Sequence, residues 1–376
     1  MTFRKVISWC LFPLTMWYAV GVWFRNLLFN VGIFRQETLP VTTIGVGNLR
    51  SGGAGKTPHV EYLLRLLSNE CSVAMLSRGY RRKTRGYVED DGEHSVARLG
   101  DEPAMVACKF PQVLVAACEK RVEGIRRLLQ REGPPQVVVL DDSFQHRQIK
   151  PTINILLTEY GSPYYNDCVL PFGDLRESRR ARFRANIVVI TKSPETINPI
   201  ERHSIVSRLG LEPYQKVFFS SIRYKDPLPL MGGAPVSLKS MDGVLVLAGI
   251  ANPDRLMQYV REQCSASLLK YADHHRYTQS DIKHIRKHFE LHVSGDRRII
   301  LTTEKDAVRL REFADKEVLA GLPIYYLPIE VHILPNKEYD FDETVLKIVH
   351  DNNLFQDKMR TTPLMNKKNY ESRDLF

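Results

Sequence analysis

Short apolar runs alternate with amphipathic stretches along most of the chain. The runs are rich in Val, Ile and Leu, which is typical of strands that are buried on both faces of a sheet. Between them, apolar residues recur every three or four positions, the spacing of a helix with one buried face. In roughly the first half of the chain these runs are residues 39–47, 72–77, 112–117, 135–142, 152–159 and 185–192. The alternation predicts an α/β fold with a parallel sheet covered by helices.

A second group of apolar runs follows the Pro- and Gly-rich stretch "KDPLPLMGGAPVS". These runs are residues 243–250, 297–306 and 322–329, again with helical patterns between them. They predict a second, smaller α/β lobe over residues 225–350. The remainder of the chain is polar, so we expect residues 351–376 to form a loose tail.

The N-terminal residues 6–24 depart from this alternation because they carry no charge. Such a segment could just span a bilayer. Its tryptophans, Pro13 and basic flanks equally suit a helix that lies in the headgroup region, and a buried core helix is a third possibility. We expect residues 1–30 to form a membrane-associated helix, whose depth the sequence leaves open. The tryptophans are Trp9, Trp17 and Trp23, and the basic flanks are Arg4, Lys5 and Arg25.

A glycine turn, "RSGGAGKTP", joins the first apolar run to an amphipathic helix. It fits the second half of the phosphate-binding pattern Gly-x₄-Gly-Lys-Ser/Thr, but Arg50 stands where the first glycine is expected. A strand, a glycine turn and a helix N-terminus direct backbone N–H groups at one point, where an anion is stabilised. A glycine-rich connection in another kind of α/β unit is the alternative. The candidate phosphate-binding residues are Gly52, Gly53, Ala54, Gly55, Lys56 and Thr57.

Two aspartates, Asp141 and Asp142, end the apolar run "VVVLDD". Hard carboxylate oxygens beside a phosphate cradle suit Mg²⁺, with the Thr57 hydroxyl as a further ligand. Two acids at this place could instead cap a helix. The combination with the glycine turn favours the metal site, and it makes residues 31–224 a candidate P-loop nucleotide-binding domain.

Further acidic and imidazole groups could move protons. Asp101 and Glu102 follow a glycine and precede a proline, which predicts a sharp loop; there they could accept a proton or cap a helix. In the second lobe, "YADHHRY" contains Asp273, His274 and His275. A carboxylate–imidazole pair can form a general base, although a histidine alone is more often structural.

The net charge indicates which classes of partner fit the protein, and the cysteine content indicates the redox compartment. The 376 residues carry a formal charge of +10, which suggests nucleic acid, anionic lipid or a phosphorylated substrate. Two arginine-rich stretches, residues 77–87 and 174–184, suit phosphate groups. No helix-turn-helix, zinc-finger or RNA-binding signature accompanies them. The six cysteines are scattered without a CxxC pair, which argues against a disulfide scaffold and fits a reducing compartment.

The motifs occur in a characteristic order along the chain. They are "VGNLRSGGAGKTP", "LSRGYRRKTRG", "GDEP", "VLDDSFQHR", "LPFGDLRES", "AGIANPDR", "DHHRYT" and "LTTEKDAVRL". This series closely resembles the tetraacyldisaccharide 4′-kinase family, the lipid A 4′-kinases of Gram-negative bacteria, over roughly residues 10–345. The chain departs from the usual family pattern at Ser143, Phe172 and Asp174, which concerns loop geometry rather than the chemistry.

The resemblance implies a P-loop kinase that uses ATP and Mg²⁺. Its expected reaction moves the γ-phosphoryl group to the 4′-hydroxyl of a tetraacyldisaccharide 1-phosphate, giving the 1,4′-bisphosphorylated precursor of lipid A. Asp101 would take the hydroxyl proton, supported by His274 and Asp273; His275 stays open as the alternative to His274. Lys56 and Thr57 would hold phosphates and Mg²⁺, with Asp141 and Asp142 around the metal. Further expected nucleotide-binding residues are Arg176 and Glu177, and weaker substrate-binding candidates are Arg78, Glu102, Gln145 and His146.

The same resemblance implies where the protein works. We expect a peripheral or monotopic enzyme on the cytoplasmic face of the bacterial inner membrane. Its partners would be the lipid A disaccharide 1-phosphate and an anionic membrane surface, with no nucleic acid and no obligate protein partner.

Two other classes of function are weaker alternatives. A membrane-associated P-loop nucleotide switch that acts on a protein partner gives the "DHH" motif no role. A guanine-specific version is disfavoured because "TKSP" has Pro194 where the base-reading Asp should stand. A nucleic-acid-binding protein would leave the Trp-rich N-terminus unexplained.

Overall fold

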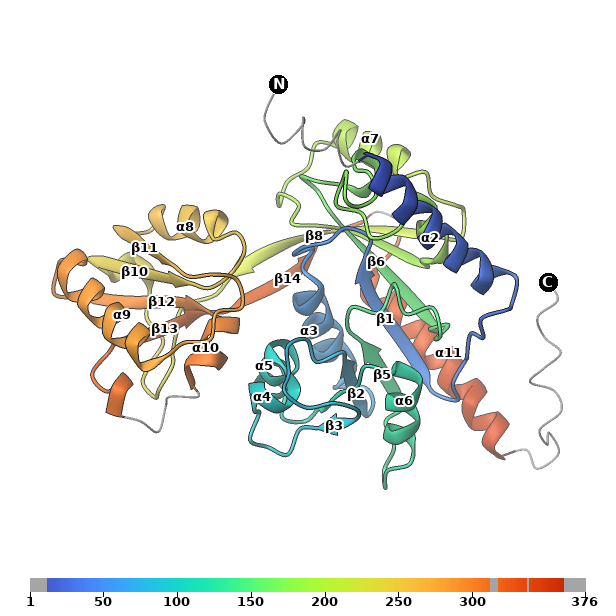
Figure 1. Cartoon of the computed structure of the whole chain (residues 1–376), viewed down its shortest axis with the longest axis horizontal. Coiled ribbons are helices and arrows are strands. Elements are labelled where there is room, and N and C mark those ends of the chain that lie inside the picture. The colour runs from blue at the N-terminus through green and yellow to red at the C-terminus, as the bar shows by residue number, and fades with distance from the viewer. Residues whose placement is uncertain (1–11, 312–316, 337, 362–376) are drawn as a thin grey trace. The chain divides into compact units, whose positions relative to one another are not determined.

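The computed structural model describes residues 12–311, 317–336 and 338–361, and the chain forms two compact units (Figure 1). Unit 1 comprises Met1–Arg78, Phe110–Ile222 and Val331–Phe376. Unit 2 comprises Gly79–Lys109 and Arg223–Glu330. The sequence pattern instead places residues 79–109 with the nucleotide-binding domain. The functional domain boundaries stay a prediction, and the two units are described separately below.

The core of unit 1 is a largely parallel sheet with the strand order β14-β8-β7-β6-β1-β5-β2-β4. Strand β1 lies centrally and pairs in parallel with β5 and β6, for example Ile44 with Val139 and with Ile153. Most strands are buried along their whole length, as their continuous apolar composition requires. The strands are β1 Thr42–Asn48, β2 Val73–Ser77, β4 Leu114–Ala117, β5 Val137–Leu140, β6 Ile153–Glu159, β7 Ile187–Thr191, β8 Lys216–Tyr224 and β14 Ile329–Ile333.

Helices surround this sheet (Figure 1). Helix α7 shows how local sequence sets their ends, since the Asn198 side chain caps its first turn and Gly210 ends it in the left-handed conformation. Within the described residues of unit 1, the helices are α2 Phe12–Asn30, α3 Lys56–Leu67, α6 Arg121–Leu129, α7 Pro199–Leu209 and α11 Phe341–Thr361, with short 3₁₀ turns at Tyr164–Asn166 and Arg179–Arg184.

Unit 2 has its own sheet, in the order β11-β10-β12-β13-β9. Its four neighbouring strands β11, β10, β12 and β13 are parallel, and the two-residue β9 pairs antiparallel at the edge. Separate apolar clusters pack on its strands, with Leu245 and Leu247 in one and Val244 and Val246 in the other. The elements are β3 Val88–Glu89, α4 Val96–Leu99, α5 Asp101–Lys109, β9 Leu228–Pro229, η3 Leu238–Ser240, β10 Gly243–Ala248, α8 Asp254–Arg261, β11 Ala266–Lys270, α9 Gln279–His292, β12 Arg298–Thr303, α10 Glu304–Arg311, η4 Glu317–Leu319 and β13 Ile324–Leu327.

Two local predictions are wrong. Helix α11 continues to Thr361, so residues 351–361 are helical rather than part of a loose tail; residues 362–376 lie outside the described residues. Asp101 and Glu102 form the first turn of helix α5 instead of lying on a loop. The sharp turn exists one residue earlier, at Gly100, whose φ is 94°.

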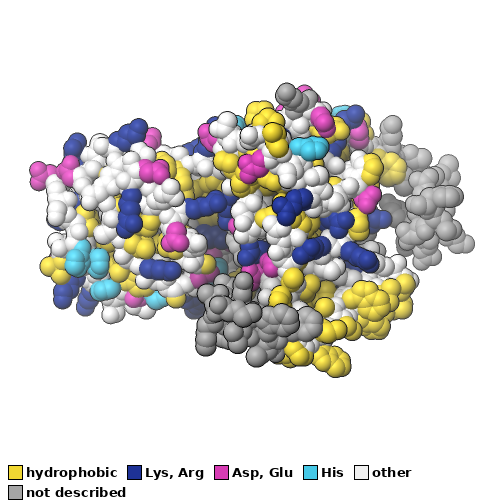
Figure 2. All heavy atoms as spheres, turned by 90° about the horizontal axis from the view of Figure 1, so that it is seen from above, with side chains coloured by type: hydrophobic (Ala, Val, Ile, Leu, Met, Phe, Trp, Pro, Cys, Tyr) yellow, Lys and Arg dark blue, Asp and Glu magenta, His cyan; other side chains and the backbone are white. Residues whose placement is uncertain are grey.

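The predicted N-terminal helix is present as α2 from Phe12, while residues 6–11 lie outside the described part of the chain. Among the described residues, no helix is both long and apolar enough to cross a bilayer. Many large apolar side chains on α2 and the turn after it face solvent, and Figure 2 shows hydrophobic side chains gathered over this helix. They include Leu14, Met16, Trp17, Val20, Trp23, Phe24, Val31 and Ile33.

Candidate active site

The glycine turn of unit 1 joins the end of β1 to the start of α3. Gly52 and Gly55 have φ values of 120° and 80°, a region that L side chains rarely adopt. Helix α3 begins at Lys56, and no side chain caps its N-terminus. Its first-turn N–H groups and the positive end of the helix dipole are therefore available to an anion.

Asn48, the last residue of β1, is the centre of a charged cluster beside this turn. Its side-chain oxygen accepts hydrogen bonds from Lys56 Nζ (3.3 Å) and from Arg176 Nη2 (2.5 Å). The same two cations approach Asp142: Arg176 donates to both carboxylate oxygens, at 3.1 and 3.2 Å, and Lys56 Nζ lies 3.6 Å away. The cluster presents two cations next to the free helix N-terminus, which suits a polyphosphate.

Asp142 is held in a constrained backbone conformation, with φ at 45°. Burial acts to raise the pKa of the Asp142 carboxyl, but the charges of Lys56 and Arg176 and the Arg176 hydrogen bond bring that pKa below its usual value. The neighbouring Asp141 is buried, and its carbonyl accepts a hydrogen bond from Arg121 (3.1 Å). Thr57, in the first turn of α3, is buried as well.

The chemistry of this donor set fits Mg²⁺. Two carboxylates and a hydroxyl supply hard oxygens, and Mg²⁺ in nucleotide sites needs only one or two carboxylates because phosphates and water complete its shell. The described residues contain no group of three or more His, Cys, Asp or Glu side chains arranged for a metal.

The remaining candidates of unit 1 differ in their placement. Glu177 is 1% exposed and binds Arg184 (2.9 Å) and Asn26 of α2 (3.0 Å), so it connects structural elements. Gln145 donates to the Asn48 carbonyl (2.8 Å) and thereby contacts the glycine turn. Arg78 is exposed and is the last residue of the first chain segment of unit 1. Burial, with the charges of Arg121 and Arg78, lowers the pKa of His146 to about 4, so His146 is neutral at physiological pH.

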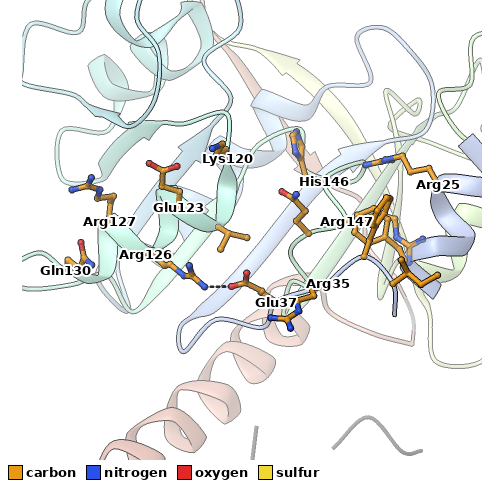
Figure 3. Close-up of a pocket in the computed structure, with 15 residues that line it drawn as sticks. Arg25, Arg35, Glu37, Lys120, Glu123, Arg126, Arg127, Gln130, His146 and Arg147 are labelled. Atoms are coloured by element: carbon orange, nitrogen blue, oxygen red, sulfur yellow. Dashed lines mark hydrogen bonds and ion pairs between the residues drawn. The ribbon is translucent and has the colours of Figure 1, made fainter. Parts of the chain in front are cut away.

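A cavity of about 1100 Å³ lies beside His146 in unit 1 (Figure 3). Its wall combines charged side chains, most of them cationic, with apolar ones, and an ion pair joins two of the lining residues, Arg126 and Glu37 (2.6 Å). The cationic residues on the wall are Arg25, Arg35, Lys120, Arg126, Arg127 and Arg147, and the apolar ones are Phe29, Ile33, Phe34 and Val122.

In unit 2 the structure brings Asp101 and His274 together. His274 Nδ1 lies 2.8 Å from Asp101 Oδ2. The φ of His274 is 59°, a left-handed conformation that is uncommon outside glycine and typical of functional sites. Asp273 is half-exposed, and its carboxylate lies 3.9 Å from His274 Nε2. His275, the alternative partner, instead binds Asp281 of α9 (3.0 Å), and Glu102 binds Lys305 (2.6 Å).

The comparisons with known proteins agree across the chain. A model of the family described as Tetraacyldisaccharide-1-P 4′-kinase matches residues 7–350. The chain belongs to this family. It is 41% identical over 359 residues to a tetraacyldisaccharide 4′-kinase of Bacteroides fragilis strain YCH46, covering 93% of this chain and 94% of that protein. It is 40% identical to the enzyme of the same name from Flavobacterium johnsoniae, covering 91% of this chain and 97% of the relative.

A solved structure supports the same assignment. The LpxK of Aquifex aeolicus, in an "apo" form in complex with ATP, superimposes with a TM-score of 0.70 at 27% sequence identity. The match covers 92% of this chain and 99% of that one. The family resemblance, the α/β fold class and the assignment of the chain as a kinase are thus confirmed.

Sequence reasoning missed two residues of this kinase. Asn48 is the residue that Lys56 and Arg176 share, and the only signal for it was its place between the strand and the glycine turn. Arg309 lies in the motif "LTTEKDAVRL", which helped to identify the family, but no role followed from the motif alone. Its side chain donates to Asp101 Oδ2 at 2.5 Å.

Proposed function

We propose that this kinase transfers the γ-phosphoryl group of ATP to the 4′-hydroxyl of tetraacyldisaccharide 1-phosphate. The observation that carries the proposal is the cluster of Lys56, Arg176 and Asp142 around Asn48, beside the open N-terminus of α3, in a chain of this family. The product would be the 1,4′-bisphosphorylated lipid A precursor.

The glycine turn binds the polyphosphate of ATP. The backbone N–H groups of Gly53, Gly55, Lys56 and Thr57 and the Lys56 ammonium would bind the β- and γ-phosphates, and the Arg176 guanidinium would add a forked donor. Thr57, Asp141 and Asp142 would hold Mg²⁺, which when bound neutralises charge that develops on the phosphate oxygens. Asp142 has a pKa below its usual value, so it is a charged ligand at physiological pH.

The Asp101–His274 pair acts as the general base. The hydroxyl oxygen of the acceptor forms a bond to the γ-phosphorus, the bond from that phosphorus to the ADP oxygen breaks, and the hydroxyl proton passes to the Asp101 carboxylate. Both polar contacts of this carboxylate use Oδ2, and Oδ1 has no hydrogen-bond partner among the described residues, so Oδ1 is the oxygen that receives the proton.

The cavity of unit 1 has the chemistry that an acylated sugar phosphate requires. Its guanidinium and ammonium groups suit an anionic end, and its Phe and Ile side chains suit acyl chains. The cavity adjoins the phosphate site because Arg25 on its wall donates to the carbonyl of Gln145 (3.0 Å), whose side chain donates to Asn48. We assign this cavity to the acceptor.

We place the enzyme at the cytoplasmic face of the inner membrane, as a peripheral or monotopic protein. The exposed apolar side chains of α2, two of them tryptophans, form a surface that water solvates poorly and that the bilayer interface accepts. The net charge of +10 adds attraction to anionic lipid. The use of ATP fits a cytoplasmic environment, and the cysteines of the described residues, none of which forms a disulfide, fit a reducing one.

Phosphate transfer from γ-labelled ATP tests the reaction. Purified protein in detergent is incubated with Mg-ATP, with and without the tetraacyldisaccharide 1-phosphate. We expect label in the lipid when Mg²⁺ is present and none when EDTA replaces it. Consumption of ATP without labelled lipid would overturn the acceptor assignment and favour a nucleotide switch. A folded protein that neither binds nor consumes ATP would overturn the assignment of the glycine turn.

A further inference from the structure

A buried ion network in unit 2 lies directly behind the Asp101–His274 pair. Arg309 of α10 donates through Nη1 to Asp306 Oδ1 at 2.8 Å. The side chains of Arg309 and Asp306 are 4% and 0% exposed. Asp306 is fixed in turn by the backbone N–H of Gly249 and by the Thr303 hydroxyl, each at 2.9 Å.

The stability of the fold does not by itself account for a buried arginine that is fixed by a buried aspartate. Burying a charge pair is costly, and an apolar pair of similar volume often stabilises a protein as well or better. Here the second nitrogen of the guanidinium, Nη2, lies 2.5 Å from Asp101 Oδ2 and 3.1 Å from His274 Nδ1. The network therefore delivers one fixed positive charge to both members of the pair.

That charge acts on the ionisation of Asp101. Burial acts to raise the pKa of Asp101, but the hydrogen bond and charge of Arg309, together with those of His274, bring that pKa below its usual value. A carboxylate can only accept, so His274 Nδ1 carries the proton in its contact with Asp101. Arg309 Nη2 lies 3.1 Å from the same ring nitrogen, so the guanidinium is in contact with both members of the pair.

The other charged groups near the pair do not duplicate this effect. Asp273 is half-exposed and 3.9 Å from His274 Nε2, and its carbonyl accepts from Arg81 (3.4 Å). Glu102 and Lys305 neutralise each other on α5 and α10. Two tyrosines also lie nearby: the Tyr80 ring packs edge-on against His274, and Tyr277 lies beside Asp306.

We propose that Arg309, anchored by Asp306, is a positioning residue that keeps the Asp101–His274 pair in its proton-accepting state. The proposal rests on the general-base role given to Asp101 above. With the guanidinium in place, the Asp101 carboxyl has a pKa below its usual value, so it is ionised and able to accept a proton. Without it, the Asp101 carboxyl retains its proton to a higher pH and can then no longer accept one from the substrate hydroxyl.

The test is the pH dependence of kcat/KM for the acylated disaccharide in Arg309→Gln. We expect the acid limb of the profile to move upward by about one to two pH units, the size of shift that a nearby opposite charge produces. Arg309→Lys keeps the charge and should restore the position of the limb while kcat stays reduced. Arg311→Gln, on the same helix but stacked on Tyr326, is the matched control and should leave the limb in place.

A structural loss and a loss of proton control give different results. Arg309→Gln leaves Asp306 buried without its cation, so Asp306→Asn/Arg309→Gln is measured in parallel; it removes both charges and should show the same upward shift. An acid limb that stays at the wild-type pH in either folded variant would overturn the proposal. Failure of the proposed function looks different, because wild-type protein would then label no lipid at any pH.

Discussion

Two residues of the candidate site, Asp142 and His274, have left-handed backbone conformations, with φ values of 45° and 59°. Such conformations cost on the order of 1–3 kcal/mol for residues other than glycine. The fold maintains them with specific contacts: Arg176 holds Asp142, and Asp101 with Arg309 holds His274. Arg81, His94 and Lys192 share this conformation, so the backbone strain includes two residues of the candidate site but is not confined to them.

Replacement of Asp101 by alanine tests its role at the level of one residue. The Asp101→Ala change removes the proton acceptor but leaves every contact of Lys56 and Arg176 intact, because those contacts are formed within unit 1. We expect kcat to fall by about 10²-fold or more, the usual contribution of a general base. The dissociation constant for ATP, measured by titration calorimetry, should stay within about twofold of wild type. Unchanged turnover would remove Asp101 from the mechanism.

The residue types of the site could be predicted from the sequence, but their pairing could not. The glycine turn and the acids after "VVVL" follow known spacing rules, so Lys56, Thr57 and the two aspartates were predictable as a group. Asp101 and His274 are 173 positions apart, and neither histidine of "DHH" is distinguished by its neighbours. The choice depends on tertiary contacts, since His275 is engaged by the α9 cap and His274 by Asp101.

At the scale of elements, helix N-termini provide several of the positions that matter. Helices α3, α5 and α10 begin at Lys56, Asp101 and Glu304. Their first turns thus contain or adjoin the residues proposed to bind phosphate, to accept the proton and to anchor the arginine beside Asp101. Helix α9 begins with a capping box, in which Thr278 and Asp281 bind each other's backbone N–H groups. Asp281 also binds His275, so this cap fixes the "DHH" segment as well as the helix.

Loss of this cap should destabilise unit 2 measurably. Thr278→Ala removes the side-chain acceptor of the Asp281 N–H, which typically costs about 1 kcal/mol. For a unit of this size that corresponds to a fall in Tm of about 2–4 °C in differential scanning calorimetry. Ser280→Ala, an exposed position in the same first turn, is the control and should change Tm by less than about 1 °C. An equal loss in both variants would contradict the capping role.

Continuous apolar runs made most strands predictable, whereas strands without that pattern were missed. Strand β11, Ala266–Lys270, is only partly buried along its length, and it contains two leucines but no β-branched or aromatic residue. The first residues of α11 are buried at Phe341, Val345 and Val349, but its last turns are polar, so no local signal marks where the helix ends. Polarity predicts exposure better than it predicts the absence of a helix.

At the scale of the whole molecule, the order of motifs identified the family, but it did not assign every segment to its unit. Residues 79–109 lie between strands β2 and β4 in the chain, so the sequence pattern places them with the nucleotide-binding domain. Their contacts are with distant residues instead, including Asp101 with Arg309 and Lys109 with Glu304 (2.7 Å). Long-range ion pairs of this kind leave no local pattern for a sequence analysis to find.

The charge of the whole chain and the apolar surface of α2 together predict how the enzyme meets a membrane. The +10 net charge should attract it to anionic vesicles, and this attraction weakens as salt shortens the Debye length. Burial of Trp17 and Trp23 in the interface depends little on salt. In vesicle sedimentation, wild-type protein should therefore bind vesicles that contain phosphatidylglycerol. Raising NaCl from about 0.05 to 0.5 M shortens the Debye length roughly threefold and should release part of the bound protein. The rest should stay bound.

Substitution of the two tryptophans separates these contributions. Trp17 and Trp23 are 78% and 61% exposed, so Trp17→Ser/Trp23→Ser should leave the fold intact. We expect this variant to bind anionic vesicles at low salt with reduced affinity and to be released almost completely at high salt, because only the electrostatic attraction remains. Tyr214→Ser, an exposed aromatic change far from α2 in the sequence, is the control and should follow the wild-type curve. Retention of the tryptophan variant on vesicles at high salt would show that α2 is not the membrane-binding element.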